Sequence, residues 1–283
     1  SWIWRAPMAD RPSRNLKPTA GRWVARLRVA LLALSVLVQA WFAAQVLWVR
    51  WQPPRETAFM AQRLAELREK DPKATIKFQW VPYERISTHL KRAVIAAEDA
   101  KFLEHEGFDW EGIAKAREKN ERRGRVVAGG STITQQLAKN LFLSPSKSYV
   151  RKGQEAIIAL MLEAFLPKRR ILELYLNVIE WGNGVFGAEA AAKRYFGVPA
   201  ARLSAEQAAR LAAMIPSPRR FERNPGSEYL DGRVDTILDA GCGTGLVGEL
   251  LRDKAQCLIG IDMSEPMLAL ARPPIRVACY GRV

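Results

Sequence analysis

Carboxylates gather with one of the chain's two histidines between Glu98 and Asp109. Upstream of this stretch, apolar residues recur at helical spacing at Ile86, Leu90, Val94 and Ala97. This pattern predicts a helix that ends at or near Glu98. The negative pole of a helix disfavours the charged form of a carboxyl there and raises its pKa, which suits a general base near neutral pH. An ordinary polar helix end that leads into a turn at Gly107 is the alternative interpretation.

A second polar cluster runs from Gly129 to Asn140, with the sequence GGSTITQQLAKN. The paired glycines permit close backbone approach, and Ser131 or Thr132 can cap a helix that begins there. If that helix continues to Leu143, Gln136, Lys139 and Asn140 share one of its faces. Helix N-termini attract phosphate groups, so this cluster can bind an anion. An ordinary capped amphipathic helix would give the same pattern.

A third cluster, Arg151 to Glu155, lies in the next expected helix, for which Ser144-Pro145 provides a start signal. Arg151 and Glu155 are one helical turn apart and can form an ion pair. The apolar residues that follow are expected to lie in the core: Ile157, Leu160, Met161 and Ala164.

These clusters read, in chain order, ED-x2-F-x2-H-x-G-x-D, GGSTITQQLAKN, RK-x2-E and KRRILELYLNVIEWGNGVFG. Together they resemble the peptidoglycan glycosyltransferases, specifically the monofunctional biosynthetic transglycosylases, over about residues 58 to 238. The resemblance implies a mainly α, lysozyme-like domain behind one N-terminal transmembrane helix. It also implies an enzyme that polymerises lipid II onto a growing glycan strand by inverting transfer, with undecaprenyl diphosphate as the leaving group.

The resemblance assigns roles to individual residues. Glu98 becomes the general base, and Glu155 becomes a second carboxylate near the leaving diphosphate, or near Mg²⁺ or Mn²⁺ bound there. Lys139, Arg151 and Lys152 match the basic residues that hold the diphosphate. The remaining positions expected to contact substrate are Asp99, Phe102, His105, Ser131, Thr132, Gln135, Gln136 and Asn140. Three further matching positions are expected to be structural: Glu163, Glu173 and Asn177.

Two other functions fit parts of the pattern. A lysozyme-like muramidase would also place a glutamate in a helical fold, but it has no use for basic residues at the diphosphate positions. A non-enzymatic membrane anchor or division scaffold would have no need for every catalytic position to be filled.

The composition indicates a membrane protein with an anionic partner. The chain has 283 residues, a net charge of +15 and 48% hydrophobic residues. Val29 to Val49 contains no charged residue and is long enough to span a bilayer, with tryptophans near its ends. Anionic lipid and a diphosphate substrate account for the positive charge, so nucleic acid is not expected as a partner. Other cell-wall synthases are partners that the resemblance allows.

The charge around this span predicts its orientation. Basic residues are denser in residues 1–28 than in the stretch that follows the span, which places the N-terminus in the cytoplasm. Residues after Arg50 then lie on the periplasmic side of the inner membrane.

After the span we expect a linker at residues 50–75 that includes a connecting helix from Thr57 to Lys70, and a glycosyltransferase domain at residues 76–238. Thr75 to Val81 alternates as one strand does.

The basic run from Glu111 to Val127 predicts either a solvated helix face or a mobile cover over the substrate. Ser204 and Gln207 form a capping box at the start of a further helix. The three glycines at 182, 184 and 187 are expected to lie in a loop.

The tail, residues 239–283, contains all three cysteines and differs in character. Its start, TILDAGCGTG, resembles the first strand and glycine loop of class I S-adenosylmethionine-dependent methyltransferases, and predicts a short α/β Rossmann-like fragment. The positions that match cofactor contacts are Asp239, Gly241, Gly243, Gly245 and Asp262. Too few residues follow Asp262 to complete a doubly wound sheet, so S-adenosylmethionine binding is not expected. A chimeric or frameshifted reading frame joined near Leu238 is the predicted origin, and a bifunctional protein is the alternative.

Overall fold

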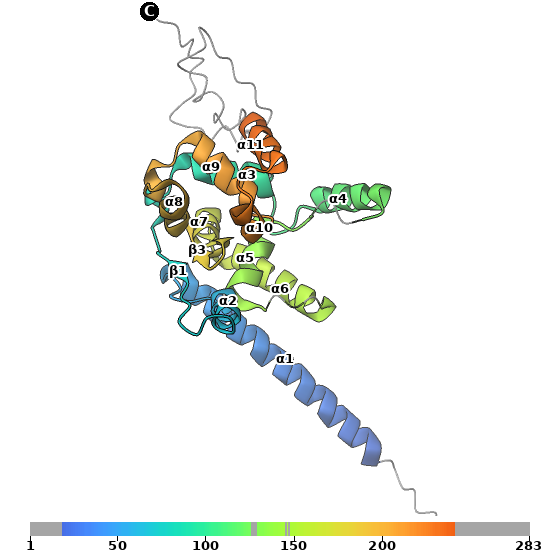
Figure 1. Ribbon diagram of the computed structural model, residues 1–283. Coiled ribbons are helices and arrows are strands. Elements are labelled where there is room, and N and C mark those ends of the chain that lie inside the picture. Colours follow the sequence, from blue (N-terminus) through green and yellow to red (C-terminus); the bar gives the residue numbers. More distant parts are fainter. Residues whose placement is uncertain (1–18, 126–128, 145, 147, 241–283) are drawn as a thin grey trace, which may run out of the picture. The chain divides into compact units, whose positions relative to one another are not determined.

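The computed structural model describes residues 19–125, 129–144, 146 and 148–240, and it is mainly helical as expected (Figure 1). The α-helices are α1 (Thr19–Trp51), α2 (Ala58–Arg68), α3 (Thr88–Glu98), α4 (Trp110–Arg123), α5 (Ile133–Phe142), α6 (Tyr149–Phe165), α7 (Lys168–Val178), α8 (Ala188–Phe196), α9 (Ala205–Met214), α10 (Pro218–Arg223) and α11 (Glu228–Ala240). Two short 3-10 helices, η1 (Tyr83–Arg85) and η2 (Ala200–Arg202), complete the helical part.

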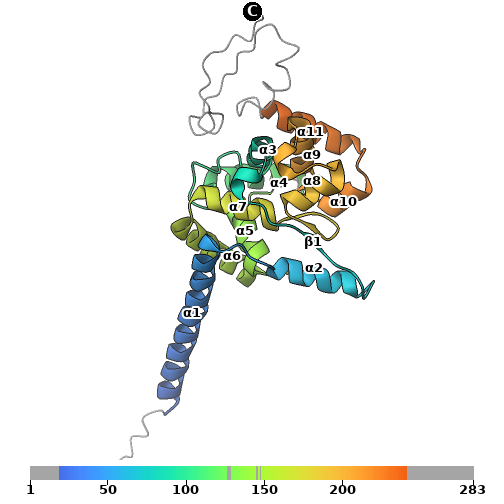
Figure 2. The same ribbon diagram turned by 90° about the vertical axis from the view of Figure 1, so that its left-hand side faces the viewer.

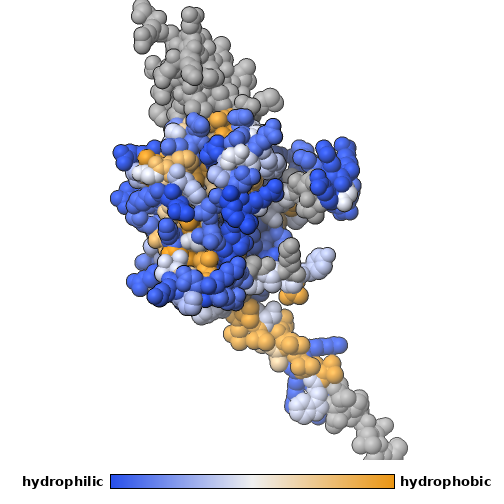
Figure 3. Space-filling view, viewed as in Figure 1, coloured by the Kyte–Doolittle hydropathy of each residue, from blue (hydrophilic) through white to orange (hydrophobic). Residues whose placement is uncertain are grey.

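The chain divides into two compact units, residues 1–44 and residues 45–283. Among the described residues, one helical stretch, Arg22–Trp51, is long and apolar enough to cross a membrane. It contains the predicted span, and α1 itself begins earlier than that span, at Thr19. Apolar side chains cover this helix in the space-filling view (Figure 3).

A small sheet lies among the helices of the second unit. It has the strands β1 (Lys77–Phe78), β2 (Glu180–Gly182) and β3 (Val185–Phe186) in the order β1-β3-β2. β1 runs parallel to β3, and β2 runs antiparallel to it. The strand predicted at 75–81 exists but is shorter. The loop predicted for the three glycines holds for Gly184 and Gly187, which lie outside the strands, but not for Gly182, which ends β2 of the β2–β3 hairpin. Gly184, with φ of +71°, makes the turn that joins these two strands.

The buried core centres on α7, which packs against α5, α6 and α8. On the other side α3 packs against α9, and α11 covers both of them, as Figures 1 and 2 show. Glu163, Glu173 and Asn177 make the structural contacts that the sequence predicted. The fully buried Asn177 accepts a hydrogen bond from Val81 N and donates one to Val81 O, both at 2.9 Å.

Helix α6 differs from its prediction in two ways. It begins at Tyr149 with Ser148 as the cap, so the predicted start at Ser144-Pro145 is wrong. Its core side chains include Ile158 and Leu162, whereas Ile157 and Leu160 are 41% and 53% exposed, which contradicts their assignment to the core. Met161 is only partly buried and Ala164 is exposed. Apolar residues surround this helix on nearly every side, so their spacing could not identify the inner face.

The C-terminal helices confirm one prediction and correct another. Ser204 and Gln207 form the expected capping box at the start of α9. α11 buries Leu230, Val234 and Ile237, so Thr236 to Ala240 belong to this closing helix, and the strand that the methyltransferase resemblance predicted to begin at Thr236 is wrong there. Asp239 lies within α11, and the other predicted cofactor positions, Gly241, Gly243, Gly245 and Asp262, lie outside the described residues.

Candidate active site

Three helix ends bring the predicted site residues together. Helix α3 ends at Glu98, α5 begins beside Ser131 and carries Gln136 and Lys139, and α6 carries Glu155 in its second turn. α5 packs against both α6 and α7, which holds its polar face in place. The site therefore forms where helices begin and end, with the helices themselves buried in the core.

Glu98 is partly buried and lines a cavity of about 190 Å³ together with Asp109, Ser131 and Thr132. Gln136 Nε2 donates a hydrogen bond to Glu98 Oε2 at 2.9 Å. Burial raises the pKa of Glu98 above its ordinary value of 4.5, and the bond from Gln136 opposes that rise. The predicted direction of the pKa shift is confirmed, but its largest cause is burial.

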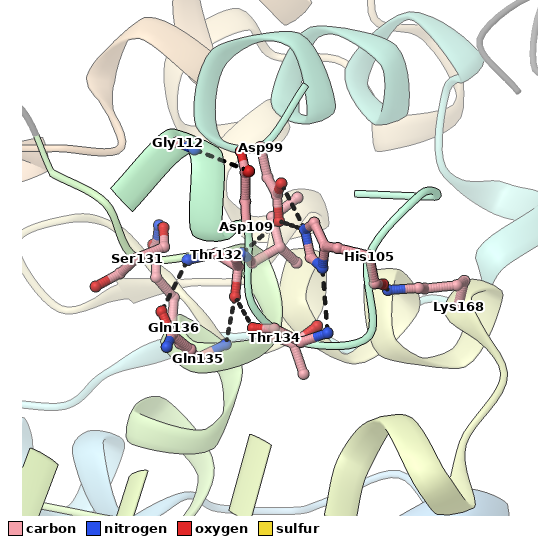
Figure 4. Close-up of polar contacts among 12 residues, drawn as sticks. Asp99, His105, Asp109, Gly112, Ser131, Thr132, Thr134, Gln135, Gln136 and Lys168 are labelled. Carbon is pink, nitrogen blue, oxygen red and sulfur yellow. Dashed lines mark hydrogen bonds and ion pairs between the residues drawn. The ribbon is translucent and has the colours of Figure 1, made fainter. Parts of the chain in front are cut away.

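Asp99, the neighbour of Glu98, is buried and makes hydrogen bonds to groups of the protein (Figure 4). Its Oδ2 accepts a hydrogen bond at 2.9 Å from the backbone N–H of Ile133, the first residue of α5. His105 Nε2 contacts Asp99 Oδ1 at 2.9 Å, while His105 Nδ1 accepts a bond from Gly107 N at 3.1 Å. Because Nδ1 is an acceptor, Nε2 carries the proton and donates to the carboxylate. Asp99 and His105 thus fix the loop after α3 to the start of α5.

The start of α5 is held by a second set of bonds, also drawn in Figure 4. Thr132 and Gln135 form a capping box, and Thr132 Oγ1 donates to Gly107 O at 2.7 Å. Phe102 is fully buried, with the Lys168 ammonium 4.7 Å from the centre of its ring. The described contacts of Asp99, Phe102, His105, Thr132 and Gln135 are therefore with the protein itself. Their predicted contact with substrate stays a prediction.

Glu155 anchors the cationic side of the site. Its side chain is almost fully buried, and Oε2 accepts a hydrogen bond from Arg151 Nη1 at 2.6 Å. Lys152 Nζ donates to Glu155 Oε1 and also lies 3.2 Å from Ser131 Oγ. The i, i+4 ion pair predicted for Arg151 and Glu155 is confirmed, and Lys152 joins it.

The fit of Glu155 to a metal ion is poor in the described part of the chain. Both of its carboxylate oxygens already accept from cations, and no group of three His, Cys, Asp or Glu side chains gathers among the described residues. Hard divalent cations require several oxygen ligands. Mg²⁺ or Mn²⁺ at this position stays a prediction.

Lys139 lies between these groups without a hydrogen-bond or ion-pair partner among the described residues. Burial lowers the pKa of its ammonium group, and the nearby Glu155 carboxylate opposes that effect. With Gln136 and Asn140 it lines a second cavity, of about 240 Å³. Arg219 and Arg220, at the start of α10, line the same cavity.

Sequence reasoning did not place Arg219 and Arg220 at this site, although a basic pair after a proline was a visible signal. It also missed Tyr175 on α7, whose hydroxyl donates to Gln136 Oε1 at 2.8 Å. Tyr175 lies within the motif KRRILELYLNVIEWGNGVFG, so the resemblance covered it, but its spacing among the apolar residues of α7 indicated a core position.

The basic run after the first cluster forms α4, which stands to one side of the other helices in Figure 1. Its ion pairs join exposed residues one turn apart, such as Arg117 Nε and Glu121 Oε1 at 2.7 Å. The predicted solvated helix face is confirmed. A cover over the substrate stays a prediction.

Comparison with known proteins adds three findings. Residues 63–241 match the family model described as transglycosylase, and residues 237–279 match one described as methyltransferase domain. The biosynthetic peptidoglycan transglycosylase of Dechloromonas aromatica (strain RCB) is 63% identical over 218 residues, which cover 77% of this chain and 94% of that relative. Relatives of the same name are 62% identical in Azoarcus sp. (strain BH72), covering 74% and 90%, and 56% identical in Bordetella pertussis (strain Tohama I), covering 78% and 95%.

Proposed function

The chain belongs to the transglycosylase family and is a peptidoglycan glycosyltransferase, and from this premise we propose how its site polymerises lipid II. The proposal rests on one observation: a candidate base and a cationic side chain lie on either side of Gln136. On one side lies Glu98, whose pKa is raised by burial, and on the other lies the ammonium group of Lys139. A base and a cation held this close suit a reaction in which one oxygen loses a proton while another departs with negative charge.

In the proposed reaction Glu98 takes the proton of the acceptor sugar hydroxyl. The resulting oxygen forms a bond to the anomeric carbon of the donor while the bond from that carbon to the diphosphate breaks. Attack opposite the leaving group inverts the configuration at that carbon. The raised pKa of Glu98 brings its basicity nearer to neutral pH, where a general base is most effective.

The departing undecaprenyl diphosphate needs positive charge. Lys139 supplies an ammonium group with no hydrogen bond to any described residue, while Arg151 and Lys152 are held in place by the buried Glu155. Preorganised cations in a partly buried site stabilise the developing charge more than exposed ones do. A muramidase that hydrolyses glycan has no departing diphosphate, so this arrangement favours the transferase.

The membrane anchor fits a lipid-linked substrate. One apolar helix near the N-terminus suggests an anchor, and we propose an inner-membrane protein with a cytoplasmic N-terminus and a periplasmic catalytic domain. In the catalytic unit, Arg50 Nη1 donates to Phe165 O at the end of α6, and Val46 and Val49 are buried. The exposed apolar side chains of α6, which include Ile157 and Leu160, would then meet the lipid surface. Other cell-wall synthases stay predicted partners.

The test is to incubate the purified full chain with lipid II and to separate polymer from cleaved glycan. We expect polymer and free undecaprenyl diphosphate, and a cleaved glycan without polymer would instead indicate the muramidase. Glu98→Gln should lower polymerisation at least about a hundredfold, because general-base assistance contributes about 10²- to 10⁴-fold. Near-normal turnover in that variant would move the base to Asp99 or Glu155.

The pH dependence of the same assay gives an independent reading. The active form of Glu98 is the carboxylate, so the rate falls as the pH drops through the pKa of this group. Since burial raises that pKa above 4.5, the loss should begin at a higher pH than for an exposed glutamate.

A further inference from the structure

Two consecutive hydrogen bonds link Tyr175 to Gln136 and Gln136 to Glu98. The Tyr175 hydroxyl donates to Gln136 Oε1 at 2.8 Å, and Gln136 Nε2 donates to Glu98 Oε2 at 2.9 Å. We infer that Tyr175 is a positioning residue that fixes the Gln136 amide so that its N–H points at the base. This inference rests on the proposed role of Glu98.

Tyr175 and Glu98, the two outer residues of this hydrogen-bonded series, fix the direction of both bonds. Tyr175 is fully buried, and its pKa is raised well above 10 by burial and by the nearby Glu98 and Asp99, so its hydroxyl keeps the proton that it donates. An ionised Glu98 can only accept. The Gln136 amide satisfies both ends in one orientation, with its oxygen toward the hydroxyl and its NH₂ group toward the carboxylate.

Besides the bond to Glu98, Gln136 Nε2 makes a long contact with Ser131 O at 3.5 Å, and the Tyr175 hydroxyl is the donor that holds Oε1. Without that hydroxyl, Oε1 of Gln136 would be left without its donor in a partly buried place, which is costly. Rotation of the amide would relieve that cost but would turn the Gln136 oxygen toward Glu98. Two acceptors would then face each other, and the carboxylate form of the base would be disfavoured.

The groups that face Glu98 decide what this rotation does to its pKa. Burial raises the pKa and Asp99 adds to that rise, while the Gln136 bond, Arg233 of α11 and Lys139 of α5 lower it. The Gln136 bond is the strongest of the groups that keep Glu98 ionised. Its loss therefore raises the pKa of Glu98 further and moves the acid limb of the rate profile to higher pH.

The experiment measures kcat/KM for lipid II polymerisation against pH in the full chain and in Tyr175→Phe. We expect the acid limb to move up by about 0.5 to 1 pH unit, the size expected for losing part of a charge-assisted hydrogen bond. At pH values above both limbs the rates of the two proteins should converge. A purely structural defect would lower the rate at every pH, and an unmoved limb or a uniform loss would overturn the inference.

Tyr195→Phe is the matched control. Tyr195 on α8 is a partly buried tyrosine, and its hydroxyl donates to Trp181 O at 3.1 Å and takes no part in the bonds that link Tyr175, Gln136 and Glu98. Tyr195→Phe should therefore leave the pH profile unchanged, even where it lowers the unfolding temperature. A shift of equal size in both variants would contradict a specific role for Tyr175.

A second variant keeps the test decisive if Tyr175→Phe does not fold. Gln136→Met keeps the length of the side chain and removes both ends of the bridge, so its acid limb should also move to higher pH. An unmoved limb in Gln136→Met would overturn the inference by itself. Glu98→Gln separates the two proposals. If it remains active the proposed base is wrong, and if it is inactive while the limb of Tyr175→Phe stays in place, only the Tyr175 inference fails.

Discussion

Replacing Lys139 by alanine should reduce catalysis without reducing stability. Lys139 has no partner among the described residues, and burial lowers its pKa, so the folded protein disfavours the charge that this residue carries at neutral pH. Removing a group whose charged form is destabilised on folding should leave the free energy of unfolding unchanged or slightly higher. An ammonium group that makes no hydrogen bond within the described part of the chain fits the proposed role of Lys139 at the diphosphate.

The size of the catalytic loss follows from the same contacts. A hydrogen bond to a charged group contributes about 1.5 to 3 kcal/mol, and about 1.4 kcal/mol corresponds to a factor of ten. Lys139→Ala should therefore lower kcat/KM for lipid II about 10- to 150-fold. The assay is polymerisation at fixed pH and salt, together with thermal unfolding of the same preparation.

Lys115→Ala is the matched control for this variant. Lys115 lies on α4, is exposed and pairs with Glu111, so its loss should change the rate by less than about twofold. Equal losses in Lys139→Ala and Lys115→Ala would refute the reasoning, because they would indicate general electrostatic attraction and not a site. A large fall in the unfolding temperature of Lys139→Ala would refute it as well.

Three other changes test the scaffold, the membrane face and the tail. Asp99→Ala leaves the first backbone N–H of α5 and a histidine without their acceptor, and should cost about 2 kcal/mol, or about 4 to 8 °C in the unfolding temperature; an unchanged unfolding temperature would contradict this role. Ile157→Ser with Leu160→Ser should slow polymerisation in liposomes and leave it intact in detergent, whereas equal rates in both would remove α6 from the lipid surface. A chain that ends at Ala240 should polymerise lipid II as well as the full chain, and calorimetry of the full chain should show no S-adenosylmethionine binding; micromolar binding that Asp262→Ala abolishes would contradict this.

Local signals predicted much of the helical fold. The start of α5 was predicted from Ser131 or Thr132 as a cap, and Thr132 is that cap. The start of α9 was predicted from the capping box of Ser204 and Gln207, because such a box is complete within four residues. The β2–β3 hairpin was not predictable in this way, since its strands are too short to show an alternating pattern. The buried face of α6 could not be predicted from the sequence, because apolar residues lie on nearly every side of this helix.

The candidate site was predictable in its residues and less so in its energetics. The position of Glu98 at the end of a helix followed from apolar spacing upstream. The burial that dominates its pKa depends on α5 and α7, which are distant in sequence. Tyr175 reaches the site because α7 packs beside α5, and the residue spacing within either segment does not show that the two helices meet.

Glu98 and Asp99 show how packing gives different tasks to two adjacent carboxylates. Asp99 follows the last residue of α3, and both of its oxygens accept from donors inside the protein, namely His105 and the first N–H of α5. Such a carboxylate has little capacity left for a substrate proton. Both carboxylates line the same cavity, but within the described part of the chain Gln136 is the only hydrogen-bond donor to Glu98, acting on Oε2. Oε1 of Glu98 is therefore left for an acceptor hydroxyl, which fits its proposed role as the base, while Asp99 holds α5 in place.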